Sequence, residues 1–407
     1  MPTIRISGGS KGYKRNDHLP IGFIRHSDAA TDMKSVTRVF YTLAIMAFLA
    51  STASAQDVHR TFDASSGGKL ILDLETGGSI VITGWNRSEV EVFVSIDGRD
   101  ADDVILEFDE SSRAIEIFTE FESRRSRADV DFEINVPYEF NLEISTSGGD
   151  VEIEGVSGSI EGSSMGGDLE LRNLSGNIDM STMGGDIWLS DSDIDGSLHT
   201  MGGDVDIRDV VGNIDGTTMG GDVTYNNVKS ARGGAKSKVT ISTMGGDVNV
   251  DEALYGADIH TMGGDIDVES AGEFVSATTM GGDITIEEID GWIEANTMGG
   301  DIEVTMIGGT EGDRHVELES MGGTIELTLP RGLSMDIEIE ITLSRDADDD
   351  DYEIISDFDL DVEVTRRGSE RRWKSSRKIV ATGEVRGGRN KIIIRTVNGD
   401  VIIREGR

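Results

Sequence analysis

Cysteine is absent from this chain of 407 residues, and proline and aromatic residues are scarce. The absence of cysteine excludes disulfide bonds, thiolate catalysis and a lipid anchor attached through a thiol. Only 4 prolines accompany 52 glycines, which excludes a collagen-like chain and a proline-rich disordered one. Hydrophobic residues make up 37% of the chain, which suits a narrow fold whose repeats each bury a thin strip.

The chain does contain a short repeat: nine copies of Met-Gly-Gly, eight of which are followed by Asp. Six of the eight intervals between copies are 18 residues, and the other two are 25 and 23 residues. A fixed short period is typical of stacked repeats, so residues at one repeat position should form ladders along the stack. The methionines are Met165, Met183, Met201, Met219, Met244, Met262, Met280, Met298 and Met321.

Within one repeat, polar and apolar residues alternate as in half-buried strands. In the repeat Met262 to Thr279, the five residues from Asp265 alternate, Ala271-Gly272 signals a turn, and Phe274 to Thr279 predicts a second strand. We therefore predict an all-β, single-domain parallel β-solenoid with coils of about 18 residues, two strands per coil and irregular capping coils at both ends. Inward positions of the second strand are predicted to recur at Ile178, Leu198, Ile214, Val239, Ile259 and Ile293.

The first 55 residues are expected to be a leader. Residues 1–32 show no periodicity and are interpreted as a segment upstream of the natural start. Residues 33–55 resemble a signal peptide, with a charged start, an apolar run from Val39 to Leu49 and the cleavage site Ala53-Ser54-Ala55. Gln56 is the predicted mature N-terminus, and an uncleaved anchor is the alternative.

The mature chain is predicted to have three parts: an N-terminal cap over residues 56–141, the regular solenoid over 142–329, and a C-terminal cap with a basic tail over 330–407. Both caps contain strand-like runs, among them Tyr352 to Val364 near the C-terminus. Solenoids need atypical end coils because open sheet edges promote aggregation.

Charge is unevenly distributed along the chain. Residues 56–365 hold 70 acidic and 17 basic side chains, whereas residues 366–407 hold 4 acidic and 13 basic ones. The acidic body argues against nucleic acid as a partner. The basic tail can dock on the acidic body or on a phosphate-bearing polymer of the envelope, and internal docking is the simpler interpretation.

The aspartates after Gly-Gly should form a ladder. In its simplest interpretation, Asp accepts hydrogen bonds from backbone N–H groups of the turn. The alternative is calcium, whose oxygen ligands would relieve the repulsion between stacked carboxylates, although the known nine-residue calcium repeat is absent. The candidates are Asp168, Asp186, Asp204, Asp222, Asp247, Asp265, Asp283 and Asp301, with Asp348 to Asp351 as a second group. No other cofactor is expected.

Two further ladders flank the turn. The Thr or Ser before each Met should point inward and bond the adjacent turn, because it alternates with inward Ile and Val. The Met row should lie at a corner, partly exposed, where it could pack, bind a partner as an adaptable apolar stripe, or ligate Cu(I). The hydroxyl residues are Ser164, Thr182, Thr200, Thr218, Thr243, Thr261, Thr279, Thr297 and Ser320.

The sequence contains little that predicts catalysis. His199 and His260 share a repeat position but lie about three coils apart, too far for a shared metal or proton relay. No cysteine nucleophile, G-x-S-x-G motif or phosphate-binding loop is present. Two loops, Lys229 to Lys238 and Met306 to His315, break the period and either mark a functional face or are tolerated insertions.

Several motifs resemble those of a known family. They are Gly84-Trp85-Asn86, Glu89 to Val92, Val136-Pro137, Asn141 to Ile144 and Thr396-Val397-Asn398-Gly399-Asp400-Val401. With the repeated turns, they are similar to the bacterial putative adhesin family, exported β-solenoid domains of unknown function. The resemblance covers most of residues 60–405 and implies an envelope or surface location, with no catalytic residues to transfer.

These observations favour a non-catalytic, exported protein of the periplasm, outer envelope or surface that binds an envelope or surface ligand, either protein or polysaccharide. It is expected to have no transmembrane span after cleavage and no nucleic-acid partner. The alternatives are a self-assembling structural scaffold or an envelope-stress protein and, less favoured, a polysaccharide-active enzyme with a carboxylate pair.

Overall fold

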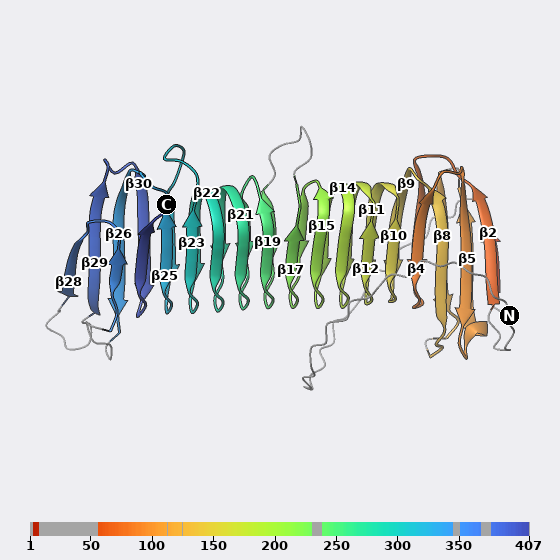
Figure 1. The fold of residues 1–407 in the computed structure, drawn as a ribbon. Coiled ribbons are helices and arrows are strands. Elements are labelled where there is room, and N and C mark those ends of the chain that lie inside the picture. Colours follow the sequence, from red (N-terminus) through yellow and green to blue (C-terminus); the bar gives the residue numbers. More distant parts are fainter. Residues whose placement is uncertain are drawn as a thin grey trace, which may run out of the picture.

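The computed structural model describes residues 3–7, 56–111, 113–123, 125–229, 238–344, 351–367 and 376–406. Figure 1 shows an elongated rod of strands stacked side by side. These residues form 31 strands and one short 3-10 helix, η1 (Ala101–Asp103), and no helix among them is long and apolar enough to cross a membrane. The all-β prediction is confirmed, whereas the predicted signal peptide lies outside the described residues.

The middle of the rod has two facing layers of parallel strands. The layer that we call the Asp sheet holds the strands after each Gly-Gly-Asp: β10 (Val151–Glu154), β12 (Leu169–Arg172), β15 (Val205–Val211), β17 (Val223–Asn226), β19 (Val248–Ala253), β23 (Ile302–Met306) and β25 (Ile325–Leu329). The Thr sheet holds the strands leading to the next Met: β9 (Phe140–Thr146), β11 (Ser157–Ser164), β13 (Ser175–Thr182), β16 (Ile214–Thr217), β18 (Val239–Ser242), β20 (Ala257–His260) and β24 (Val316–Ser320). Three long strands, β14 (Ile187–Thr200), β21 (Ile266–Thr278) and β22 (Ile284–Thr297), run through both sheets.

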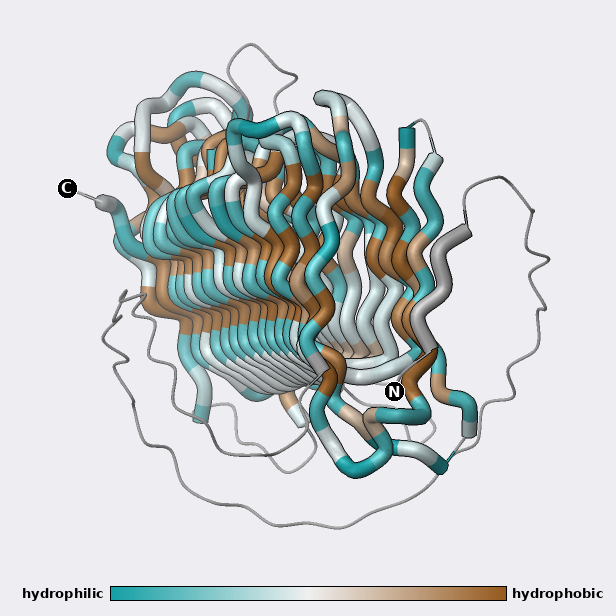
Figure 2. Tube along the Cα trace, turned by 90° about the vertical axis from the view of Figure 1, so that its right-hand side faces the viewer, coloured by the Kyte–Doolittle hydropathy of each residue, from teal (hydrophilic) through white to brown (hydrophobic). Residues whose placement is uncertain are grey.

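Each coil pairs in register with the coil before it. Leu169 pairs with Ile187 and Ile160 pairs with Ile178, in both cases one 18-residue repeat apart. The two irregular repeats keep the pairing of the Asp sheet, since Val223 pairs with Val248 and Ile302 pairs with Ile325. The register shifts between Ile286 and Ile289, where β22 pairs with β23. Figure 2 shows the result: hydrophobic and hydrophilic residues line up in continuous bands along the rod.

The core-facing residues of the Thr sheet form two rows, not the single row that the sequence predicted. Ile178 aligns with Gly196 and Ile214, whereas Met180 aligns with Leu198. The single-row prediction was wrong because the large apolar side chain does not occupy the same position in every repeat. Leu198, for example, lies two positions after Gly196, the residue that pairs with Ile178.

Large side chains compensate for glycines in these rows. Tyr225 is fully buried, and its hydroxyl group would lie 2.9 Å from a Cβ atom at Gly216. The same hydroxyl donates a hydrogen bond to the carbonyl oxygen of Ile214 over 2.8 Å. The side chain thus fills the space that Gly216 leaves in its own row.

The second corner of the coil is often not a break in the strand. The sequence predicted a turn at Ala271-Gly272 between two strands, whereas the structure keeps one continuous strand, β21, through a corner at the next residue. The chain bends there at a single residue, Glu273, with a φ of 60°. Asn173, Asp209 and Asn227 hold the same left-handed conformation, which Asn and Asp tolerate better than most residues.

The N-terminal cap contains the predicted strand runs in an order that the sequence did not predict. Outward from β10, the Asp sheet continues with β4 (Ile80–Trp85), β8 (Asp129–Pro137), β5 (Glu89–Asp97) and β2 (Gln56–Asp63). Outward from β9, the Thr sheet continues with β3 (Gly68–Leu74), β7 (Ala114–Phe121), β6 (Val104–Glu110) and β1 (Thr3–Ser7). Pairs β8–β5, β5–β2 and β7–β6 are antiparallel, so this cap is not a series of parallel coils.

The C-terminal cap folds back on itself. Strands β30 (Asn390–Val397) and β31 (Val401–Glu405) insert between β24–β25 and the pair β26 (Met335–Leu343) and β27 (Ile354–Ser356). Beyond β26 lie the antiparallel strands β29 (Ser376–Val385) and β28 (Asp361–Arg367). The run predicted from Tyr352 to Val364 is therefore two strands, β27 and β28, which end different sheets.

The inserted strands bring basic residues of the tail onto the acidic body. Arg395 pairs with Glu317 over 3.1 Å and with Glu319 over 2.5 Å, and Arg404 pairs with Glu326. For these arginines, the internal docking predicted from charge is confirmed.

The second glycine of each Met-Gly-Gly corner lies against the backbone of the preceding coil. A Cβ atom at Gly203 would lie 2.1 Å from the carbonyl oxygen of Gly185, and one at Gly221 would lie 2.1 Å from that of Gly203. The first glycine is not crowded: a Cβ atom at Gly202 would lie 3.6 Å from its nearest neighbour. Only the second glycine is sterically required.

We predict that Gly203→Ala destabilises the chain by about 3 kcal/mol or more, because the new methyl group must push two coils apart. Gly202→Ala, one residue away, should change the free energy of unfolding by less than about 1 kcal/mol. Denaturant unfolding of both variants tests this, and equal losses would show that the close approach is not the controlling contact.

Candidate functional site

The Met-Gly-Gly-Asp corner is the most repeated feature of the rod, and its buried hydroxyl groups join successive coils. The Thr200 hydroxyl donates to the carbonyl oxygen of Gly185 in the preceding coil over 2.8 Å and accepts from the N–H of Gly203 in its own corner over 3.3 Å. The inward orientation predicted for this row is confirmed. The same donation to the preceding coil is made by Thr182, Thr218, Thr243, Thr261, Thr279, Thr297, Ser320 and Thr396.

The aspartate ladder also joins coils. The backbone N–H of Asp204 donates to Oδ1 of Asp186, and the N–H of Asp222 donates to Oδ1 of Asp204, each over 2.8 Å. All eight predicted aspartates lie in this ladder, which starts at Asp150. The carboxylates therefore have a structural role that needs no metal ion.

Calcium at this ladder stays a prediction. Within the described ranges, no group of three or more His, Asp or Glu side chains is arranged to hold a metal ion. Of the second predicted group, Asp348, Asp349 and Asp350 lie outside those ranges.

The nine methionines form an exposed row along one corner, which we call the Met stripe. Their exposed fractions range from 40% at Met201 to 62% at Met321, so the predicted partial exposure is confirmed. A row of flexible, polarisable side chains can adapt to irregular partner surfaces.

An acidic groove of about 620 Å³ crosses the outer face of the Asp sheet. Asp251, Glu269 and Glu287 form one row across β19, β21 and β22, and Asp267 lies beside them. The sequence analysis missed this groove, although acidic residues recurring at the same position in successive repeats could have indicated it.

Like charges raise the proton affinity of this groove. Burial raises the pKa of Asp267, and the charges of Asp265 and Asp247 raise it further. A hydrogen bond with Asp251 raises the pKa of Glu269. The groove can therefore attract cationic groups.

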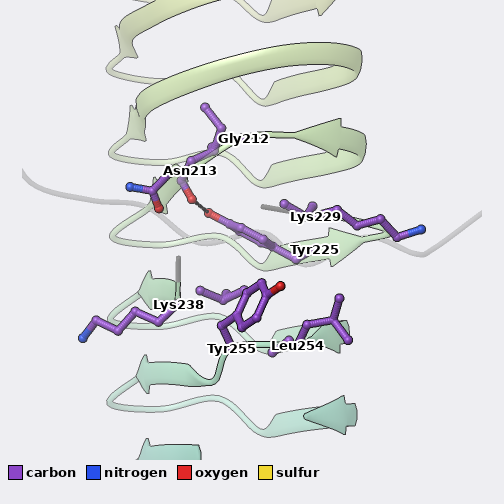
Figure 3. A pocket seen from close by; sticks show the side chains of 11 residues that line it. Gly212, Asn213, Tyr225, Lys229, Lys238, Leu254 and Tyr255 are labelled. Carbon is purple, nitrogen blue, oxygen red and sulfur yellow. Dashed lines mark hydrogen bonds between the residues drawn. The ribbon is translucent and has the colours of Figure 1, made fainter. Parts of the chain in front are cut away.

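A small hollow lies where the first inserted loop leaves the rod. Figure 3 shows Lys229 and Lys238 on opposite sides of this hollow, with Tyr255 and the buried Tyr225 between them. Burial raises the pKa of Tyr225 far above its usual value. Residues 230–237 of this loop lie outside the described residues, so its function stays a prediction.

The second inserted loop is anchored to the rod. Arg314 is buried, pairs with Asp290 and donates from Nε to the carbonyl oxygen of Gly309 over 3.3 Å. The loop also contacts the start of β30, since the N–H of Arg314 donates to Oδ1 of Asn390 over 3.2 Å and the N–H of Lys391 donates to Nδ1 of His315 over 2.8 Å.

The two repeat-position histidines lie three strand steps apart, as predicted from the period. His260 lies 3.0 Å from a carboxylate oxygen of Asp258, whose pKa is lowered mainly by a hydrogen bond from Lys238. The geometry does not bring the two histidines together.

Comparison with known proteins identifies the family of this chain. The family described as Toastrack DUF4097 matches residues 61–275, more than half of the chain. The chain belongs to this family. No curated protein is significantly similar to it.

The solved structures to which the chain is similar are distant from it in sequence. A putative cell adhesion protein from Clostridium sporogenes is 9% identical, with 87% of this chain and 100% of that chain covered and a TM-score of 0.20. A putative adhesin from Parabacteroides distasonis is 13% identical, covering 62% and 98% of the two chains, with a TM-score of 0.34. A putative lipid binding protein from the same organism is 16% identical, covering 62% and 97%, with a TM-score of 0.31.

If the aspartate ladder acts through hydrogen bonds, Asp222→Ala should lower the free energy of unfolding by about 1–2 kcal/mol, because the N–H of Asp247 loses its acceptor. Asp222→Asn keeps an acceptor oxygen and should lose less than half as much. Melting both variants and the unaltered Toastrack chain with excess Ca²⁺ and with chelator extends the test. A calcium-dependent shift that either substitution abolishes would instead support a calcium site.

The acidic groove predicts a pH dependence with a defined sign. Because the folded-state pKa of Asp267 is raised, folding favours its protonated form, so stability should rise as pH falls from 7 through that pKa. Asp267→Asn should raise the melting temperature at pH 7 by about 1–2 °C and flatten this dependence, as expected of screened surface charges. Asp206→Asn, which removes the partner of Arg208, is the control and should not stabilise.

Proposed function

We propose that this Toastrack protein is a non-catalytic, exported, single-domain β-solenoid that binds a protein or polysaccharide at the cell envelope or surface. The observation that supports this most is the Met stripe, in which nine copies of one exposed apolar side chain follow a straight corner of the rod. Weak contacts repeated along a line add up through avidity, without any single deep pocket.

Residues 33–55 would direct the chain across the inner membrane as a signal peptide and would then be removed. The composition fits this route, since a chain without cysteine needs no oxidative folding. Export is required both for an adhesin-like role outside the cell and for an envelope-stress role in the periplasm. The first role places the rod outside the outer layer of the cell, and the second places it inside that layer.

The arrangement of the charged residues supports binding rather than catalysis. Asp267 and Glu269, two carboxylates whose pKa values are raised, lie in the open acidic groove with like charges. An acid–base pair would need two groups whose environments separate their pKa values. A polysaccharide-active enzyme is accordingly the weakest of the candidate functions.

The location is tested by protease shaving of intact cells, with mass spectrometry of the released peptides and of the mature N-terminus. Release of peptides between Thr61 and Arg404 is expected for a surface rod. Protection until the outer layer is broken would favour the periplasmic, envelope-stress role.

Binding is tested with beads that carry the purified chain and with cells of the producing bacterium from which the gene is deleted. We expect a variant with Gln at Met201, Met219, Met244, Met262 and Met280 to bind at least tenfold less, because avidity multiplies the loss of each contact. The matched control carries Gln at Ser181, His199, Thr217, Ser242 and His260, a row on the outer face of the Thr sheet. Equal binding by the two variants would contradict a role for the Met stripe.

A further inference from the structure

The C-terminal end of the rod leaves a strand uncovered. Strand β28 pairs only with β29 among the described strands, and Val362 and Val364 are 53% and 51% exposed. They pair with Ala381 and Ile379, both buried, so the two valines lie on the core face of the Thr sheet. The Thr sheet therefore extends past the Asp sheet at this end.

Native edge strands are normally blunted by charge, bulges or covering segments, because an open apolar edge templates pairing with another chain. Strand β28 carries charged residues, but the two valines on its core face are half exposed, and no second strand among those described pairs with its outer edge. A half-exposed core face at a sheet edge is typical of a surface that a further strand covers.

At the N-terminal end, removal of the leader would leave the Asp sheet longer than the Thr sheet, the reverse of the C-terminal end. The outer edge of β6 is occupied by β1, which pairs with it in parallel from Thr3–Ile105 to Ser7–Asp109. Strand β1 precedes the predicted cleavage site, so cleavage would remove it and open the edge of β6. The Asp sheet would then extend one strand further, through β2.

Strand β2 covers the opened position from the other layer. The rings of Phe62 on β2 and Phe108 on β6 lie 5.8 Å apart between their centroids, so the two strands pack face to face. Val58 lies on the same core-facing side of β2 as Phe62. A strand added beside β6 would therefore find an apolar surface above it.

The two ends are complementary in length and direction. Strands β6 and β28 each contain 7 residues. Strand β6 is antiparallel to its neighbour β7. Strand β28 is antiparallel to β29, which is antiparallel to β26, so β28 and β26 point in the same direction. In a straight continuation of the rod, β28 of one chain would meet β6 of the next as an ordinary antiparallel pair.

We propose that chains freed of the leader associate head to tail, with β28 of one chain pairing with β6 of a second copy in the place that β1 occupies in the full chain. We call this contact between β28 and β6 the joint, and it rests on the removal of the leader proposed above. It would continue the Thr sheet from chain to chain and would bury Val362 and Val364 beneath β2. Because this contact is heterologous and follows a straight rod, it produces open filaments and not closed rings.

Engineered cysteines test the joint directly, because the natural chain contains none. In an antiparallel pair of β6 and β28, two registers give the greatest overlap while keeping the core-facing side chains of both strands on the same side. One register pairs Glu107 with Glu363, and the other pairs Glu107 with Thr365. Odd-numbered residues of β6 bond to β7, as the Glu122–Asp103 and Ser111–Ala114 hydrogen bonds show, so Glu107 is a non-hydrogen-bonded position on the open side. Such positions bring Cα atoms to about 4.5 Å, within reach of a disulfide.

The experiment uses the secreted chain, after mass spectrometry has shown that it begins at Gln56. Oxidised Glu107→Cys/Glu363→Cys or Glu107→Cys/Thr365→Cys should show a ladder of dimers, trimers and longer species on non-reducing gels. The control, Glu363→Cys/Thr240→Cys, places the second cysteine in the middle of the rod and should show none. Absence of a ladder from both test pairs would overturn the proposal.

Sedimentation velocity provides a second readout without cysteines. The secreted chain should show a mass that rises with concentration, and Val362→Lys/Val364→Lys should stay monomeric with an unchanged melting temperature. The control, Asp361→Asn/Glu363→Gln, should associate like the unaltered chain. A monomeric secreted chain at all concentrations would overturn the joint, while the bead assay of the Met stripe would be unaffected by that result.

Discussion

The close approach of successive backbones at the Gly-Gly corner is the constraint on which the rod depends. A side chain on the second glycine would overlap the carbonyl oxygen of the preceding coil, as at Gly203 and Gly185. That same carbonyl oxygen accepts a hydrogen bond from the Thr200 hydroxyl, so one atom both limits the side chain at Gly203 and bonds the next coil. The corner thereby sets the spacing and register of both sheets, and the remaining ladders inherit that register.

Stacking identical repeats has an electrostatic cost that the corner also reduces. Unit charges one coil apart, at about 4.8 Å, repel by about 0.9 kcal/mol in water, and the body of the chain is strongly acidic. In the aspartate ladder, each carboxylate faces the N–H of the next coil. In the acidic groove, the pKa of Asp267 is raised by burial even though Thr285 donates a hydrogen bond to it, and the pKa of Glu269 is raised by a hydrogen bond with Asp251.

The middle and the ends of the rod solve different problems. The middle repeats one corner and could be lengthened without changing its contacts, as expected of solenoids in general. The ends depart from this repeat, with antiparallel strands and with a coil inserted out of sequence order. Irregular strand order and direction are therefore concentrated at the caps, whereas the repeated contacts that avidity requires are available only along the regular part.

The sequence by itself determined the all-β class, the coil length, the inward Thr row and the exposed Met stripe, because each depends on local alternation repeated at a fixed period. Only the tertiary structure decided which rows the core residues of the Thr sheet join, since Leu198 and Ile178 occupy different slots of similar repeats. It also decided the place of β30 and β31, the antiparallel caps and the acidic groove. These features arise from contacts between residues far apart in the chain, where burial and edge pairing outweigh the local pattern.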